Sequence, residues 1–105
     1  MQIILSPQRR DARLTLARNG DILTINGQNF DFGPLQEGAV LPPSAVQSDW
    51  LAGDITRQGG ELIIPVFLPH GANAPHETLF PEPLVVSANG AIELPLYEIE
   101  ADDEH

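Results

Sequence analysis

The sequence predicts an all-β protein, either a small antiparallel sandwich or a partly open barrel of six to eight short strands with at most one short helical turn. The main signal is three Asn-Gly pairs, Asn19-Gly20, Asn26-Gly27 and Asn89-Gly90, which lie between short runs of alternating apolar residues. Such pairs favour type I′ hairpin turns, because asparagine and glycine reach positive φ at low cost. A second signal is that no stretch has an apolar period of 3.6 residues long enough for a helix.

The first two pairs predict a three-stranded meander over residues 11–33. A two-residue loop at Asn19-Gly20 makes Arg18 face Asp21 and Leu16 face Leu23. A loop at Asn26-Gly27 makes Leu23 face Phe30. Both registers gather apolar side chains on one face, namely those of Leu14, Leu16, Leu23, Ile25, Phe30 and Phe32. A shift of one residue would turn this face to solvent, so the agreement between the two loops supports the meander.

Gly59-Gly60 predicts a further hairpin in which Arg57 faces Leu62 and Ile55 faces Ile64. Pro65 then follows in the second strand of this hairpin. Proline has no N–H to donate to a ladder, so we expect this strand to lie at a sheet edge or to bulge at Pro65.

Three other segments complete the expected fold. Asn89-Gly90 predicts a hairpin that pairs Ser87 with Ile92 and Val85 with Leu94. Residues 2–5 are apolar enough to add a strand at the N-terminus. Residues 44–51 predict one helical turn with Ser44 as its N-cap, because this serine follows two prolines.

Length and charge predict a single β domain over residues 1–96 and an acidic, disordered tail over residues 97–105. The chain has five arginines, no lysine and a net charge of −10, and residues 61–105 contribute −9 of this charge. An alternative is that the tail is an interaction segment, with Leu96, Tyr97 and Ile99 as apolar anchors. A duplex-binding surface needs many basic side chains, so we expect no direct nucleic-acid binding.

The sequence indicates neither disulfides nor membrane insertion. The chain contains no cysteine. The apolar run at its N-terminus is too short for a signal peptide, and no segment approaches the length of a membrane span. The expectation is therefore a protein made in the cytoplasm that does not enter a membrane.

Residues 68–81 contain three of the ten prolines and predict a long ordered loop. Long loops in small domains are often functional, so we expect any partner-binding surface here. The alternative is that the loop only crosses between sheets or covers an edge, with Phe80 inserted into the core. The candidate partner-binding residues are His70, Asn73, His76, Phe80, Tyr97 and Ile99.

No pattern specifies a cofactor, a metal or a catalytic centre. His70, His76 and Glu77 could ligate zinc, but their spacing matches no known motif and a fourth ligand is missing. The serines lie outside any nucleophile-elbow context, and the glycines lie at hairpin tips and not in a phosphate loop. Trp50, the only tryptophan, is expected to be a core residue at a sheet corner.

Several short segments together give the chain a resemblance to a known group of proteins. They are residues 3–7 (IILSP), 23–27 (LTING), 30–32 (FDF), 48–50 (SDW), 68–71 (LPHG), 73–75 (NAP) and 79–81 (LFP). Over nearly its full length, the chain resembles short uncharacterised proteins encoded in phage and prophage genomes, often near tail or tail-fibre genes. The resemblance implies a location in the bacterial cytoplasm or in the virion, and it carries over no catalytic residue.

Three functions follow as hypotheses. The first is a non-enzymatic phage or prophage accessory protein that acts through protein contacts, in tail or tail-fibre assembly. The second is an acidic mimic of nucleic acid that blocks a host DNA-binding protein. The third is a small carbohydrate-binding or hydrolytic β domain.

Overall fold

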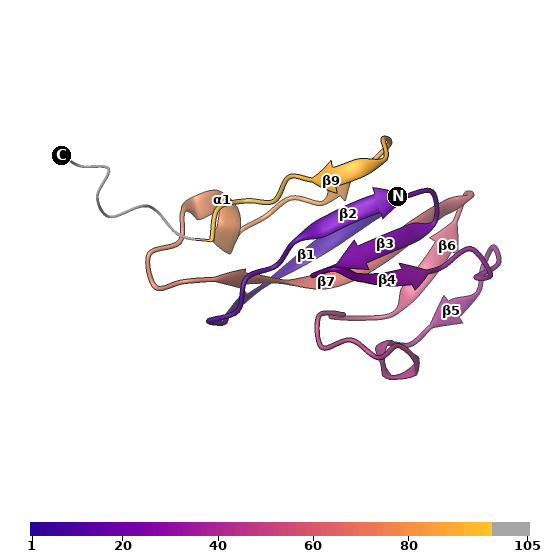
Figure 1. The fold of residues 1–105 in the computed structure, drawn as a ribbon, viewed down its shortest axis with the longest axis horizontal. Helices are drawn as coiled ribbons and strands as arrows, with labels where there is room; N and C mark the ends of the chain where they lie inside the picture. Colours follow the sequence, from indigo (N-terminus) through magenta and orange to yellow (C-terminus); the bar gives the residue numbers. More distant parts are fainter. Residues whose placement is uncertain (98–105) are drawn as a thin grey trace.

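A computed structural model describes residues 1–97, which form nine strands and two short helical turns (Figure 1). The strands are β1 (Gln2–Arg9), β2 (Leu16–Asn19), β3 (Ile22–Ile25), β4 (Gln28–Asp31), β5 (Val40–Leu41), β6 (Ile55–Gln58), β7 (Glu61–His70), β8 (Leu84–Val85) and β9 (Gly90–Ile92). The turns are the 3₁₀ turn η1 (Pro43–Ala45) and the single α-helical turn α1 (His76–Leu79). The predicted all-β class is confirmed.

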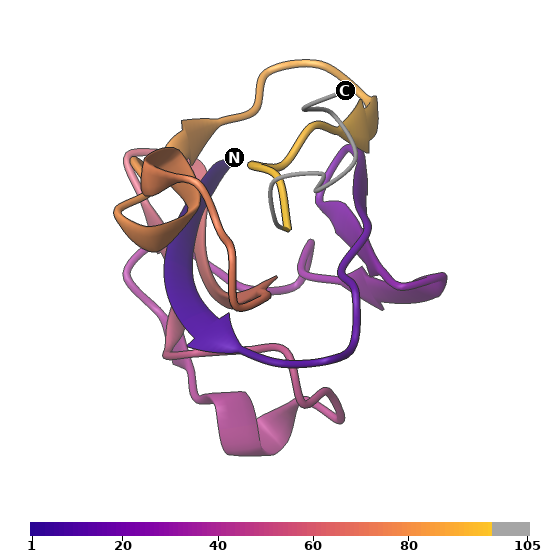
Figure 2. The same cartoon turned by 90° about the vertical axis from the view of Figure 1, so that its left-hand side faces the viewer.

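The strands form two sheets that pack on one core. One sheet has the strand order β5-β6-β7-β1-β8, and the other has the order β4-β3-β2-β9. Figure 2 shows β1 on one side of the interior and the strands of the meander on the other. Both sheets contribute to a single apolar cluster, whose most deeply buried members are Ile3, Leu23, Ile55, Ile64 and Val66. Burial of this cluster is the main force that holds the sheets together.

The meander over residues 11–33 is present as β2, β3 and β4. Its second turn matches the prediction, because Ile25 pairs with Gln28 and Leu23 with Phe30. Asn26 has a φ of 50° and Gly27 has a φ of 84°. Positive φ at both central residues is the requirement of a type I′ turn.

The register of the first turn was predicted incorrectly. Leu16 pairs with Ile25 instead of Leu23, and Arg18 pairs with Leu23 instead of Asp21. The loop is therefore Gly20-Asp21, and Gly20 has a φ of 62°. Glycine at the first central position is typical of a type II′ turn, which also suits a hairpin. The apolar face is unchanged, because each partner moves by two residues and side chains alternate with a period of two.

The β6–β7 hairpin has the predicted register, with Arg57 opposite Leu62. Of the two alternatives for its second strand, the edge position is wrong, but the pairing is interrupted at Pro65. The register changes there from Thr56 opposite Ile63 to Leu51 opposite Val66, which leaves two extra residues in the partner chain. β7 lies between β6 and β1. The N–H of Phe67 donates to the carbonyl of Trp50. The backbone N–H and C=O groups of the odd-numbered residues of β7 therefore point away from β1. Pro65 is among them, opposite the segment that precedes β6, where the N–H of Ala52 donates to the carbonyl of Pro65 at 3.1 Å. The missing N–H therefore removes no bond to β1.

The N-terminal strand is longer and more central than predicted. β1 runs parallel to β7 from the pair Gln2 and Ile63 to the pair Arg9 and His70. A parallel pair needs a crossover connection, and residues 10–60 supply it by building the meander, β5 and β6 on the way. The two strands thus form the longest pairing in the described chain and join its first residues to its middle.

Asn89-Gly90 does not form the predicted hairpin. β8 pairs with β1 in the first sheet, whereas β9 pairs with β2 in the second. Residues 86–89 therefore pass from one sheet to the other. The side chain of Asn89 stabilises the neighbouring turn instead, since its Oδ1 accepts a hydrogen bond from the N–H of Gly20 at 2.9 Å.

The predicted helical turn within residues 44–51 is present but begins earlier. η1 starts at Pro43, its N-cap position is Pro42, and no side chain caps it. Ser44 is thus inside the turn, because proline occupies the first helical position readily and shifts the start toward it. Within the described residues, no helix is long and apolar enough to span a membrane.

Candidate functional site

The loop predicted over residues 68–81 begins later than expected, because residues 68–70 are the last part of β7 and pair with β1. The connection that follows carries an exposed apolar surface at one end of the molecule, beside α1. We call this surface the end patch and define it by His76, Leu79, Phe80 and Leu96. Phe80 is 68% exposed, Leu96 is 60% exposed and Leu79 is 38% exposed. The rings of His76 and Phe80 lie 4.9 Å apart between centroids. The alternative that Phe80 inserts into the core is therefore wrong.

Thr78 holds the end patch in place. Its side chain is fully buried, and its hydroxyl donates to the carbonyl of Leu96 at 2.5 Å. Among residues 1–97, it is the only buried polar side chain. Figure 1 shows α1 beside the chain that follows β9, as this bond requires. The bond therefore places the backbone of Leu96 next to α1, although the two are far apart in the sequence.

Two other candidates, His70 and Tyr97, lie next to each other and are tied to the body of the fold. The N–H of Gly71, directly after His70, donates to the carbonyl of Tyr97 at 3.0 Å. The hydroxyl of Tyr97 donates to the carbonyl of Arg10, and the guanidinium of Arg13 lies 3.8 Å from the centroid of its ring. Tyr97, which the sequence placed in the tail, is thus packed against the domain.

The remaining candidates are less informative. Asn73 lies exposed in the turn after His70. Ile99 and the rest of the predicted tail lie outside the described residues, which end at Tyr97. The structure brings His76 and Phe80 together and brings His70 close to Tyr97. Within residues 1–97, no three histidine, aspartate or glutamate side chains gather in a way that could hold a metal ion.

Trp50 is half-buried against the core, as expected for a packing residue, but it also lies at the surface of a groove. Arg10 stacks on its ring, with the guanidinium carbon 4.5 Å from the ring centroid. The same guanidinium lies 4.9 Å from the ring of Phe67, and it donates to the carbonyl of Asp49 at 3.1 Å. Arg10 thereby fixes the position of the tryptophan. No sequence pattern predicts this contact, because 40 residues separate the two side chains.

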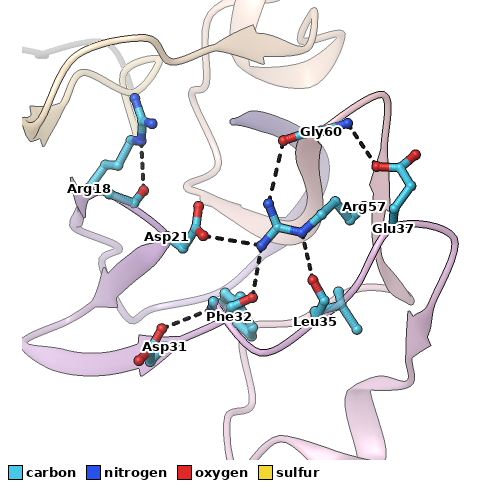
Figure 3. A network of polar contacts seen from close by, with 10 residues as sticks. Arg18, Asp21, Asp31, Phe32, Leu35, Glu37, Arg57 and Gly60 are labelled. Atoms are coloured by element: carbon cyan, nitrogen blue, oxygen red, sulfur yellow. Dashed lines mark hydrogen bonds and ion pairs between the residues drawn. The ribbon is translucent and has the colours of Figure 1, made fainter.

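Arg57 is the most connected polar side chain in Figure 3. Its guanidinium is only 15% exposed and donates to the carbonyls of Leu35 and Phe32, at 2.6 and 3.1 Å. It also pairs with Asp21 at 3.2 Å. Because Arg57 is on β6 and Asp21 precedes β3, the guanidinium connects the two sheets.

Glu37 stabilises the same region from the other side of the β6–β7 turn. Its two carboxylate oxygens accept hydrogen bonds from the N–H groups of Gly59 and Gly60, at 2.7 and 2.8 Å. Figure 3 shows the bond to Gly60. Hydrogen bonds from backbone N–H groups to a carboxylate are charge-assisted and strong. Arg57 and Glu37 therefore serve the fold, and neither is available for a ligand.

The arginines are largely used inside the fold, which leaves the surface acidic. Arg10, Arg13, Arg18 and Arg57 each make a contact with an aromatic ring or a backbone carbonyl. Residues 1–97 contain five arginines and ten acidic residues, so five minus ten gives a net charge of −5 for the described part.

No protein-family model, curated protein or solved structure matches this chain.

Proposed function

We propose that this is a non-enzymatic accessory protein of a phage or prophage, which binds another protein through the end patch during tail or tail-fibre assembly. The observation that carries the proposal is the exposure of Phe80 at the end of α1 and of Leu96 in the segment to which Thr78 bonds this turn. Aromatic and aliphatic side chains presented on a fixed support are typical anchors of protein interfaces. The phage setting rests on the sequence resemblance.

The charge of the chain favours a basic partner. Glu77 and Glu82 flank Leu79 and Phe80 in the sequence, and both are exposed. The whole chain carries a net charge of −10. Two copies of the chain would therefore repel each other, whereas a basic surface would be attracted and would approach faster. The partner we expect has an apolar pocket for Phe80 with arginine or lysine at its rim.

The test is the solution mass by light scattering, for the chain alone and mixed in turn with each protein encoded by the genes next to its own. We expect one stoichiometric complex. Phe80→Ser removes the central anchor and should weaken this complex at least about tenfold, the loss expected for a buried aromatic at an interface. The matched control is Val40→Ser, because Val40 is 56% exposed but lies on β5, at the far edge of its sheet.

Two results would contradict the proposal. In one, the chain stays monomeric with every neighbouring protein. In the other, a complex forms but survives Phe80→Ser and is lost when Glu77 and Glu82 are replaced by glutamine. The second result would favour the acidic mimic of nucleic acid instead.

A further inference from the structure

A groove with a volume of about 670 Å³ lies between the β3–β4 turn and the segment that runs from η1 to Trp50. Its position is remote from the end patch, since η1 and α1 lie apart in both Figure 1 and Figure 2. The volume is within the range of small-molecule sites. The side chains that matter for its chemistry are those of Gln28, Ser44, Gln47, Asp49 and Trp50.

The polar side chains of this groove divide into two kinds. Asn26 and Ser48 bond to the chain itself: the amide of Asn26 bonds to Thr15 and Arg13, and the hydroxyl of Ser48 accepts from the N–H of Trp50. In contrast, the side chains of Gln28, Gln47 and Asp49 are exposed and make none of the side-chain hydrogen bonds found within residues 1–97. Their donors and acceptors are available to a ligand.

Trp50 supplies a rigid aromatic surface in the same groove. The stacked guanidinium of Arg10 and the bond from Arg10 to the carbonyl of Asp49 hold the ring and its preceding residue. The N–H of Phe67 donates to the carbonyl of Trp50 at 2.8 Å, which anchors the backbone to β7. A side chain that is already fixed loses little conformational entropy when a ligand packs against it.

From these observations we infer that the groove binds an uncharged oligosaccharide. A sugar ring presents apolar C–H groups on its faces and hydroxyl groups around its rim. The indole of Trp50 suits the apolar C–H faces of the sugar. The amides of Gln28 and Gln47 suit its hydroxyl groups, because an amide both donates and accepts hydrogen bonds. The single carboxylate of Asp49 accepts hydrogen bonds from hydroxyl groups and disfavours an anionic ligand, since no arginine lines the groove.

The chain carries its own reporter for this site. Trp50 is the only tryptophan, so tryptophan emission reports on the groove alone. The experiment is a fluorescence titration of the full chain with hexasaccharides of α-1,4-glucose, β-1,4-glucose and β-1,4-N-acetylglucosamine, and with dextran sulfate as an anionic control. We expect a saturable change in emission with at least one neutral hexasaccharide and none with dextran sulfate.

Variants separate binding in the groove from a general effect on the fold. Gln47→Ala removes one amide from an exposed loop and should weaken binding about tenfold, the effect of one lost hydrogen bond to a ligand. Gln28→Ala should act similarly. Gln58→Ala is the matched control, because Gln58 is an exposed glutamine at the end of β6 and does not line the groove. Calorimetry of the Trp50→Phe variant, which has no tryptophan emission, should show weakened binding as well.

The inference is overturned if none of the three neutral hexasaccharides changes the emission at up to about 10 mM, a weak limit for specific binding. It is equally overturned if binding occurs but Gln28→Ala and Gln47→Ala leave it unchanged. Phe80→Ser should not alter saccharide binding, so this experiment and the test of the protein-contact proposal can fail independently.

Discussion

Replacing Arg57 by methionine should destabilise the protein far more than removing its only ion pair. Methionine keeps much of the aliphatic packing of arginine but none of its donors. The variant leaves the carbonyls of Leu35 and Phe32 without the guanidinium that they bond in the folded chain. It also removes the side-chain bonds between β6 and the meander, because no other side chain of β6 makes these contacts in residues 1–97.

The expected loss of stability follows from the burial of the Arg57 side chain and of its partners. A hydrogen bond to a charged group contributes about 1.5–3 kcal/mol, so two such bonds to a guanidinium that is 15% exposed contribute at least about 3 kcal/mol. Asp21 is 45% exposed, so its ion pair with Arg57 is screened by solvent and contributes at most about 1 kcal/mol. The bonds to the backbone carbonyls, and not the ion pair with the carboxylate, therefore account for most of the contribution of Arg57 to the free energy of unfolding.

The assay is urea unfolding followed by the fluorescence of Trp50, with the free energy of unfolding taken from linear extrapolation. Arg57→Met should lower this free energy by about 3 kcal/mol and Asp21→Asn by less than about 1 kcal/mol. Arg9→Met is the control for removing a positive charge, because Arg9 is exposed at the end of β1. The reasoning is refuted if Asp21→Asn costs as much as Arg57→Met, or if Arg57→Met costs no more than Arg9→Met.

Five further substitutions test three features of the fold by the same assay. Gly27→Val should lower the free energy of unfolding by about 1–2 kcal/mol, because a β-branched residue is strained at the φ of 84° found there; Gly27→Asn should cost clearly less, and equal losses would contradict the turn. Thr78→Val, of similar volume, should cost about 1–3 kcal/mol by leaving the carbonyl of Leu96 without its donor, and an unchanged stability would show that this bond does not hold α1. Pro65→Ala should be nearly neutral, whereas Val66→Pro removes an N–H that faces β1 and should cost about 3 kcal/mol or more; the opposite order would show that the ladder is assigned to the wrong edge of β7.

Local turn chemistry accounts for most of what the sequence predicted correctly. Asn26-Gly27 and Gly59-Gly60 fix the registers of their hairpins, because the backbone conformation of two adjacent residues determines how the flanking strands pair. At Asn19-Gly20 the same rule gave the wrong register. Gly20 can be either the second residue of a type I′ loop or the first of a type II′ loop, and the sequence does not distinguish these. The apolar face was still predicted correctly, because the observed register differs from the predicted one by two residues and side chains two apart lie on the same face.

Contacts between distant segments account for what the sequence did not predict. No local signal indicates that β1 pairs in parallel with β7, because the pairing closes over residues 10–60. The hairpin predicted around Asn89-Gly90, with Val85 opposite Leu94, is wrong for the same reason. A local turn signal cannot show that β8 and β9 pair with strands of different sheets. Apart from Gly60, the partners of Arg57 lie 22 to 36 residues away in the chain. Contacts between residues so far apart in the sequence depend on how the whole core packs.

Only part of the end patch could be predicted from the sequence. Prolines and a long connection indicated an ordered loop over residues 68–81; in the structure residues 68–70 belong to β7, and the connection after them contains α1. Whether Phe80 points inward or outward could not be read from the sequence, because an apolar residue in a loop is compatible with both. Leu96 joins the patch only through its bond to Thr78, which again connects separate parts of the chain.

The most direct test of the protein-contact proposal is the hydrogen-exchange footprint of the complex between this chain and its partner. The proposal predicts slowed exchange at the amides of residues 76–80 and 96 when the partner is bound, with little change along β4 and β5. Slowed exchange confined to the exposed edge of β4, with residues 76–80 unaffected, would contradict it and would place the contact on the meander.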